Sequence, residues 1–111
     1  RVVHIAQKVQ MKQLETTISK NGFLYQQRIR NEHAAVYQQF EDGVHVAYEV
    51  GIVKKVETKE VFGKVIEAHE AFWGNEDFGK IAWVFHDRVK AFDQFRIATT
   101  RAIEQLKTKV K

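Results

Sequence analysis

The chain has 111 residues and a net charge of +4, with 44% hydrophobic and 29% charged residues. This composition is typical of a globular domain and excludes an intrinsically disordered chain. Cysteine and proline are absent, which excludes disulfides, thiolate zinc sites and proline-rich linkers, and no apolar run approaches the roughly 18 residues of a membrane-spanning helix. We therefore expect a cytoplasmic protein with a single domain over residues 1–111. In an alternative, the domain begins at Met11 and residues 1–10 are an N-terminal extension.

The first predicted element is a β-hairpin over residues 12–30. Residues 1–10 before it suit either a short helix or an added strand. Within the hairpin, alternating apolar positions lead into Asn21-Gly22, and further alternation follows from Phe23. Because Asn and Gly tolerate positive φ, this pair predicts a type I′ turn. On the second strand, Ile29 is expected on the face of Phe23, and Arg28 on the opposite face.

A longer strand follows over residues 43–56, after a third strand over 34–40 and a turn at Asp42-Gly43. Its alternation places Tyr48 and Val50 on a core face and His45 and Glu49 on the other face. We expect this strand to be central, with shorter strands pairing along both of its edges. The first four strands then form an antiparallel meander.

The second half of the chain predicts two more strands and a helix. Residues 61–73 suit either a helix or a strand; we favour a strand near 61–66 that pairs with the long strand, followed by an irregular segment. A loop over 74–79 and a short strand over 80–85 come next. Asp87 then caps an amphipathic helix to about Lys107. Its apolar positions recur at helical spacing and are Val89, Phe92, Phe95, Ala98, Ala102, Ile103 and Leu106.

The predicted fold class is therefore α+β: an antiparallel meander sheet of five or six strands packed against one C-terminal helix. The core lies between this helix and the apolar face of the sheet. Phe92 and Phe95 supply its largest helical side chains, so Phe92→Ala is expected to be among the most destabilising single changes.

Several short motifs resemble those of small uncharacterised proteins encoded by bacteriophages and related mobile elements, notably in Bacteroidota. The motifs are Asn21-Gly22-Phe23, Ala47-Tyr48-Glu49-Val50, Gly74-Asn75-Glu76-Asp77-Phe78-Gly79-Lys80, Ala82-Trp83 and a helix with Ala91 and Phe95. The resemblance covers about residues 11–106. It implies a phage-encoded protein acting in the host cytoplasm, and it implies no activity.

Catalytic and metal-binding patterns are weak. Ser19 is the sole serine and lies beside a turn, so the sequence offers few candidates for a catalytic nucleophile. Five histidines occur without a His-Glu-x-x-His spacing, which favours surface or capping roles. We expect no enzyme activity, no metal and no cofactor.

The face of the sheet away from the helix is the first candidate site. Arginine and glutamine donors alternate there with rings on which bases can stack, which is a pattern of single-strand binders. We predict nucleic-acid contacts at Arg28, Arg30, Tyr37, Gln39, His45 and Lys54. In the alternative, this is an ordinary hydrated sheet face, and Glu49 on the same face disfavours a phosphate path.

The second candidate is a protein-binding surface at the loop after the fifth predicted strand. Aromatic residues gather near two glycines there, and such residues are common in interface hot spots. The predicted contacts are Trp73, Asn75, Glu76, Asp77 and Phe78; in the alternative, the aromatic residues close the core. The sequence therefore predicts a non-enzymatic binding protein for single-stranded nucleic acid or, alternatively, a module that engages a host protein. A sheet with one exposed face also predicts a homodimer.

Overall fold

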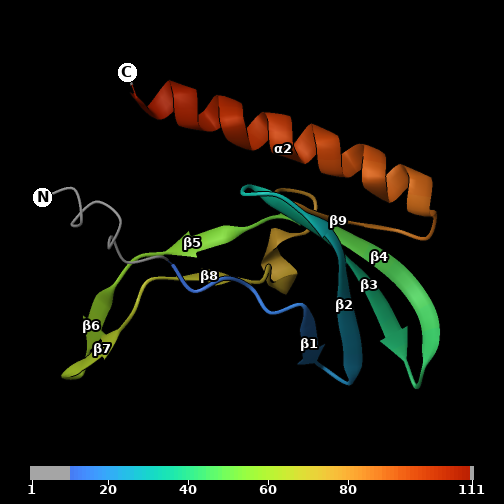
Figure 1. Cartoon of the computed structure of the whole chain (residues 1–111), viewed down its shortest axis with the longest axis horizontal. Coiled ribbons are helices and arrows are strands. Elements are labelled where there is room, and N and C mark those ends of the chain that lie inside the picture. Colours follow the sequence, from blue (N-terminus) through green and yellow to red (C-terminus); the bar gives the residue numbers. More distant parts are fainter. Residues whose placement is uncertain (1–10, 111) are drawn as a thin grey trace, which may run out of the picture.

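Five strands and one long helix form the body of the protein within residues 11–110, the part of the chain that the computed structural model describes. The antiparallel sheet has the order β1-β2-β3-β4-β9, and α2 lies across one of its faces (Figure 1). This confirms the predicted α+β class. The elements are β1 (Thr17–Lys20), β2 (Phe23–Arg30), β3 (Ala34–Glu41), β4 (Val44–Ile52), β9 (Ala82–Phe85) and α2 (Arg88–Val110). The predictions for residues 1–10 lie outside the described residues.

Two-residue turns close the first hairpins where the sequence predicts them. Asn21 and Gly22 have φ of 55° and 84°, and Asp42 and Gly43 have φ of 52° and 81°. Both central residues of a type I′ turn need positive φ, and Asn, Asp and Gly adopt it most readily. The β1–β2 and β3–β4 hairpins are therefore confirmed.

The first strand is shorter than predicted. It begins at Thr17, whereas the sequence predicts a strand from about Lys12. Lys12 pairs elsewhere: its carbonyl oxygen accepts a hydrogen bond of 2.7 Å from the N–H of Glu70. The chain ahead of β1 thus runs beside residues 68–70 instead of extending the sheet.

The predicted long strand divides into two pieces. β4 pairs with β3 on one side and β9 on the other, as expected of a strand inside the sheet. It ends at Ile52, and β5 (Lys54–Val56) pairs instead with β8 (His69–Ala71). At the junction, the N–H of Val53 donates to the carbonyl of His33 at 2.9 Å. The strand therefore leaves the sheet at Val53.

The strand predicted near residues 61–66 does not pair with β4, so that prediction is wrong. β6 (Lys59–Val61) and β7 (Lys64–Ile66) pair with each other instead. Phe62 and Gly63 form the turn between them, with φ of 52° and 79°. This small hairpin projects away from the sheet at the end of β5 and β8 (Figure 1). A short 3₁₀ turn, η1 (Asn75–Asp77), follows in the predicted loop.

Irregular register at two places changes which side chains share a face. The β2–β3 register shifts between Gln27 and Ile29, and the β3–β4 register shifts between Gln39 and Phe40. One extra residue in a strand reverses its alternation beyond that point. Ile29 accordingly packs on the α2 side of the sheet, whereas Phe23 packs on the other side. The prediction that both share a face is wrong.

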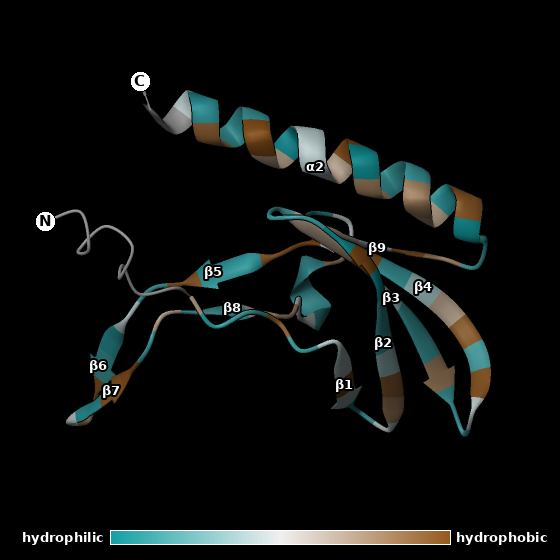
Figure 2. Cartoon of the chain, in the orientation of Figure 1, coloured by the Kyte–Doolittle hydropathy of each residue, from teal (hydrophilic) through white to brown (hydrophobic). Residues whose placement is uncertain are grey.

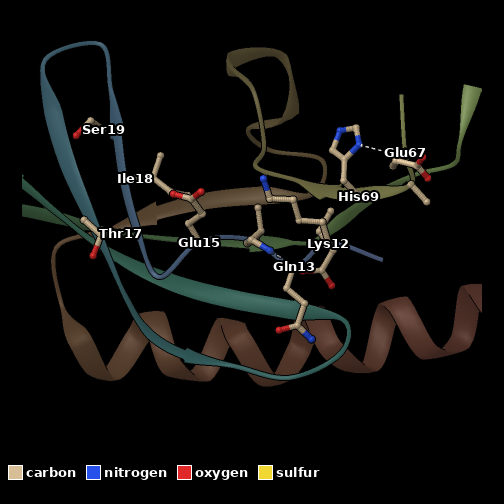
Figure 3. A pocket seen from close by; sticks show the side chains of 11 residues that line it. Lys12, Gln13, Glu15, Thr17, Ile18, Ser19, Glu67 and His69 are labelled. Carbon is tan, nitrogen blue, oxygen red and sulfur yellow. Dashed lines mark hydrogen bonds between the residues drawn. The ribbon is translucent and has the colours of Figure 1, made fainter. Parts of the chain in front are cut away.

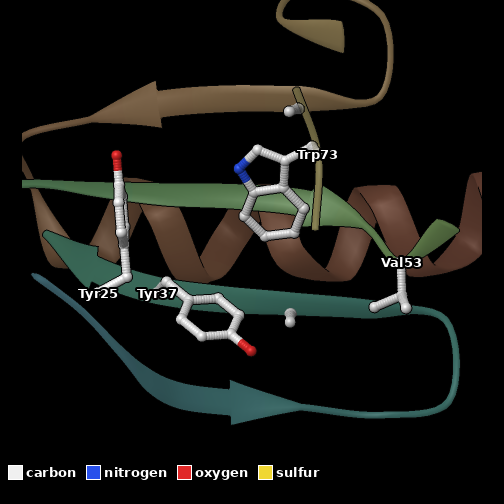
Figure 4. Close-up of a cluster of buried hydrophobic side chains, with 6 residues drawn as sticks. Tyr25, Tyr37, Val53 and Trp73 are labelled. Carbon is white, nitrogen blue, oxygen red and sulfur yellow. The ribbon is translucent and has the colours of Figure 1, made fainter. Parts of the chain in front are cut away.

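Both faces of the sheet are covered. On the α2 side, Val36 and Val50 pack with Phe95 of the helix. On the other side, Tyr37 and Trp73 belong to a second core, whose buried members are Tyr25, Ala35, Tyr37, Val53, Trp73 and Ala82 (Figure 4). Gly51 permits this layer, since a Cβ there would lie 2.3 Å from Cε3 of Trp73. The face predicted to be exposed is therefore an interior surface over much of its area.

The helix begins at the predicted cap, but it buries fewer of its apolar positions than the sequence predicts. Asp87 caps it, because Oδ1 of Asp87 accepts a 3.0 Å hydrogen bond from the N–H of Val89. The buried positions are Ala91, Phe95, Ala98 and Ala102. Val89, Ile103 and Leu106, predicted on the apolar face, are exposed; Figure 2 shows apolar residues along more than one side of α2. No helix in residues 11–110 is long and apolar enough to cross a membrane.

Candidate functional site

Arg28 lies on the α2 side of the sheet, at the irregularity in β2. Its Nε donates to Oε1 of Gln38 at 2.8 Å, and its Nη2 donates to Oε1 of Gln26 at 3.0 Å. The guanidinium also lies over the ring of Phe40, 5.9 Å from its centroid. Among residues 11–110 no carboxylate pairs with it. The side chain is thus held in place while its charge stays uncompensated.

His45 lies beside the same glutamine. Its Nδ1 is 2.8 Å from Nε2 of Gln38, and its ring centroid is 5.0 Å from that of Tyr48. The shifted register before Phe40 brings His45 to this side, away from Glu49. The prediction that His45 shares a face with Glu49 is therefore wrong. The result is a group of rings next to Arg28.

Arg88 completes a cleft at the start of α2. The cleft has a volume of about 420 Å³ and is lined by Arg28, Gln38, Tyr48 and Arg88. Arg88 lies over the ring of Phe92, 5.3 Å from its centroid, and has no carboxylate partner within the described chain. Its position at the first residue of α2 adds the positive end of the helix dipole. Two arginines and a polar lining make this cleft suited to an anion.

Arg30 and Lys54, in contrast, have carboxylate partners. Arg30 binds Glu70 through two hydrogen bonds of 2.7 and 3.0 Å, and these hold the pKa of Glu70 below its usual value. Nζ of Lys54 lies 3.1 Å from Oδ2 of Asp77. Both pairs join the sheet or β5 to the segment that returns from the β6–β7 hairpin. Their geometry assigns them a structural role.

Tyr37 and Gln39 are buried in the second core. The hydroxyl of Tyr37 donates to the carbonyl of Glu15 at 2.7 Å and accepts from Nε2 of Gln27 at 2.9 Å. Burial raises the pKa of Tyr37. Nε2 of Gln39 donates to the hydroxyl of Tyr25 at 2.9 Å. The six residues predicted to bind nucleic acid therefore do not form one surface: Arg28 and His45 lie together, and the other four are buried or paired elsewhere.

Glu49 is the centre of the polar network in the second core. Its Oε1 accepts a hydrogen bond of 3.0 Å from Nε1 of Trp73, and its Oε2 lies 3.4 Å from the donating hydroxyl of Tyr25. Burial raises the pKa of Glu49. Every buried side-chain polar atom in the described residues has a partner. The network therefore satisfies itself and presents no free group to a ligand.

The predicted protein-binding loop is held by internal contacts. Trp73 is completely buried, so the alternative of core closure is the one that the structure shows for it. Oδ2 of Asp77 accepts a 2.8 Å hydrogen bond from the N–H of Gly74, which lowers the pKa of Asp77. Phe78 packs partly against the second core. Asn75 and Glu76 remain exposed, and a role of this loop in partner binding stays a prediction.

A second cleft, of about 550 Å³, lies between the chain ahead of β1 and residues 67–70 (Figure 3). Charges of both signs line it: Lys12 and Glu15 from the chain ahead of β1, and Glu67 and Glu70 from the segment opposite. Nδ1 of His69 is 2.9 Å from the carbonyl of Glu67. Glu70 is engaged by Arg30, so one lysine and two glutamates remain, and this cleft lacks the positive charge that would favour an anion. No group of three His, Asp or Glu residues within 11–110 is arranged to hold a metal ion.

Three residues of the arginine cleft were not among the predicted contacts. These are Gln38, Tyr48 and Arg88, and the sequence predicts Tyr48 on the core face of its strand. The predicted cap at Asp87 does locate Arg88 at the start of α2, which was the available signal. The register shift that brings His45 beside them leaves no trace in the alternation of the sequence.

No family model, curated protein or solved structure matches the chain. The resemblance to bacteriophage proteins therefore stays a prediction.

Proposed function

We propose that the protein is a non-enzymatic binding protein that holds single-stranded nucleic acid in the cleft between β2–β4 and the start of α2. One observation carries the proposal: Arg28 and Arg88 converge on a cleft of about 420 Å³ without a carboxylate partner in the described chain. Uncompensated arginines at a concave surface attract phosphate groups.

The rings beside the cleft favour a single strand over a duplex. His45 is exposed and lies against Tyr48, so a base that is free of its own stack could lie on the imidazole. In a duplex the base faces are covered by neighbouring bases. Phosphate contacts from the arginines and stacking on His45 would together follow a short stretch of one strand.

Fluorescence anisotropy with a labelled oligothymidylate tests the proposal. Arg28→Ala and Arg88→Ala should each weaken binding roughly tenfold to hundredfold, because each removes charge-assisted hydrogen bonds to phosphate. Affinity should also fall steeply as salt rises, since binding releases counterions. Arg28→Lys should lie between the wild type and Arg28→Ala, because lysine keeps the charge but lacks the planar fork.

Arg96→Ala is the matched control. Arg96 is exposed on α2 and pairs with Asp93, so its loss changes the net charge equally without touching the cleft. Arg30→Ala should lower stability rather than binding, because Arg30 is engaged by Glu70. An affinity that is undetectable, independent of salt, or equally weakened by Arg96→Ala would refute the proposal.

A further inference from the structure

Three polar side chains are joined in a row beside the arginine cleft. Nε of Arg28 donates to Oε1 of Gln38 at 2.8 Å, and Nε2 of Gln38 lies 2.8 Å from Nδ1 of His45. We call these three residues the relay. Arg28 and Gln38 line the cleft. The relay therefore connects an arginine of the cleft to a titratable side chain.

The relay determines which of its nitrogen atoms carry protons. An arginine side chain only donates hydrogen bonds, so the amide of Gln38 must present its oxygen to Arg28. The amino group of the amide, which also only donates, then faces His45. Nδ1 of His45 must therefore accept, which requires a neutral imidazole with its proton on Nε2. The relay is thus compatible with the uncharged form of His45 alone.

Protonation of His45 would break the relay at one of two places. A proton on Nδ1 would face the amino group of Gln38, so that two donors oppose each other. If the amide turned over to present its oxygen to Nδ1, its amino group would instead oppose Nε of Arg28. Either the imidazole leaves Gln38, or Gln38 leaves Arg28. The second change frees Nε of Arg28 to donate to an anion.

His86, which lies just ahead of α2, behaves differently. Its Nδ1 is 3.2 Å from the carbonyl oxygen of Val46. Because a carbonyl only accepts, this nitrogen must carry a proton, and it can do so in both the neutral and the charged ring. The hydrogen bond of His86 therefore survives protonation, whereas that of His45 does not.

The charges around His45 are mostly positive on the cleft side. The charged or titratable side chains on the surrounding elements are Arg28 of β2, Glu41 of β3, Asp42 of the following turn, Tyr48 of β4, His86 and Asp87 ahead of α2, and Arg88 of α2. No carboxylate in residues 11–110 forms an ion pair with His45. A positive charge on His45 would thus join two unpaired arginines, and an anion in the cleft would supply the opposite charge.

We propose that the cleft binds its ligand together with a proton: occupation of the cleft by a phosphate group is accompanied by uptake of one proton from solvent at Nδ1 of His45, and Gln38 is the positioning residue that transmits this change to Arg28. This regulation rests on the proposed function of the cleft. Histidine changes charge between about pH 5 and 8, so the affinity for single-stranded nucleic acid should rise as the pH falls through this range. Reciprocally, a bound strand should favour the charged form of His45.

Anisotropy of a rhodamine-labelled oligothymidylate without a terminal phosphate tests the coupling, because neither thymine nor the phosphodiester changes charge in this range. The wild type should bind about tenfold more tightly at about pH 5.5 than at about pH 8, since the charged imidazole adds a favourable interaction with phosphate. His45→Phe keeps a ring but cannot take up the proton, so its affinity should not depend on pH. His86→Asn is the control and should retain the full pH dependence.

Nuclear magnetic resonance of the free protein tests the relay without a ligand. At about pH 8, the nitrogen shifts of His45 should show an unprotonated Nδ1 and a protonated Nε2. The Nε–H signal of Arg28 should move as His45 takes up its proton at lower pH. Gln38→Leu should abolish this movement, because the two residues are connected only through the amide of Gln38.

Failure of the coupling and failure of the binding function give different results. Absence of binding at every pH would refute the function and the coupling together. Binding of equal strength at both pH values, a pH dependence that persists in His45→Phe, or an Arg28 signal that still follows His45 in Gln38→Leu would overturn the coupling alone.

Discussion

Glu49 is an ionisable residue that is buried beside the second core, with 7% of its surface exposed. Its side chain is held by the indole of Trp73 and the hydroxyl of Tyr25, and Nζ of Lys20 donates to the nearby carbonyl of Trp73 at 3.0 Å. Burial disfavours the carboxylate and raises the pKa of Glu49, while these donors and the lysine partly offset that cost. The carboxyl group thus links two side chains of the core by hydrogen bonds. Its burial in the charged form at neutral pH also lowers the stability of the fold.

The first prediction at this scale concerns pH. A folded-state pKa above the unfolded value means that the folded protein binds the proton more readily. The contribution of Glu49 to stability is therefore least favourable above the folded pKa, and it improves as the pH falls through that value. In urea unfolding, the wild type should gain stability relative to Glu49→Gln as the pH falls from neutrality towards the ordinary pKa of a glutamate, about 4.3.

Glu49→Ala supplies the comparison for that experiment. It leaves Nε1 of Trp73 without its acceptor in a buried site, so it should cost about 1–3 kcal/mol at neutral pH. Glu49→Gln keeps an amide oxygen for the indole and should cost less. Parallel pH curves for the wild type and Glu49→Gln would show that the folded-state pKa of Glu49 is not raised.

At the scale of elements, turns were predictable and strand irregularities were not. Asn21-Gly22 and Asp42-Gly43 indicate their hairpins because both residues suit positive φ. The third turn, at Phe62-Gly63, was missed since phenylalanine is disfavoured there. Sequence preference thus locates a turn only where the turn is made of favoured residues.

The register shifts affected the prediction of the candidate site more than the missed turn did. An apolar–polar alternation assumes one residue per step on each face, and an extra residue reverses that assignment without changing the composition. The shift in β4 places His45 on the α2 side, contrary to the prediction. Arg28 does lie opposite Phe23, as predicted, but that side of β2 is the α2 side because Phe23 and Tyr25 pack in the second core. The second core was missed for a related reason: Trp73, which covers that face, returns from a segment whose own strands were mispaired.

The packing of α2 changes which of its two phenylalanines should contribute more to stability. Phe95 is 8% exposed and lies in the core with Val36 and Val50, whereas Phe92 is half-buried beneath the guanidinium of Arg88. Phe95→Ala should cost about 3–5 kcal/mol. Phe92→Ala should cost less, contrary to the ranking from the sequence, because its ring already contacts solvent.

Urea unfolding at one pH measures both changes. Ile97→Ala serves as the control, since Ile97 is on the same helix and is 54% exposed; its effect should stay below about 1 kcal/mol. Equal losses for Phe92→Ala and Phe95→Ala would mean that the two rings are buried to a similar extent.

At the scale of the whole molecule, β3 is the strand that contributes side chains to both cores. Residues 34–37 have no exposed area, and successive side chains enter the α2 core and the second core alternately. The segment with Trp73 forms the second layer and is joined to the sheet by the Arg30–Glu70 pair. The hairpin of β6 and β7, which we call the arm, is at the opposite extreme, because all of its strand residues are exposed. Stability should therefore decrease from the sheet outwards.

Native-state hydrogen exchange tests this gradient. Amides of β3 and of the inner part of β4 should exchange most slowly and report global unfolding. Amides of the arm should exchange fastest, because they open without disturbing either core. Phe95→Ala should speed exchange in β3 while leaving the arm unchanged, since only the former depends on global stability. An arm as protected as β3 would mean that the hairpin is anchored to the cores and opens only with them.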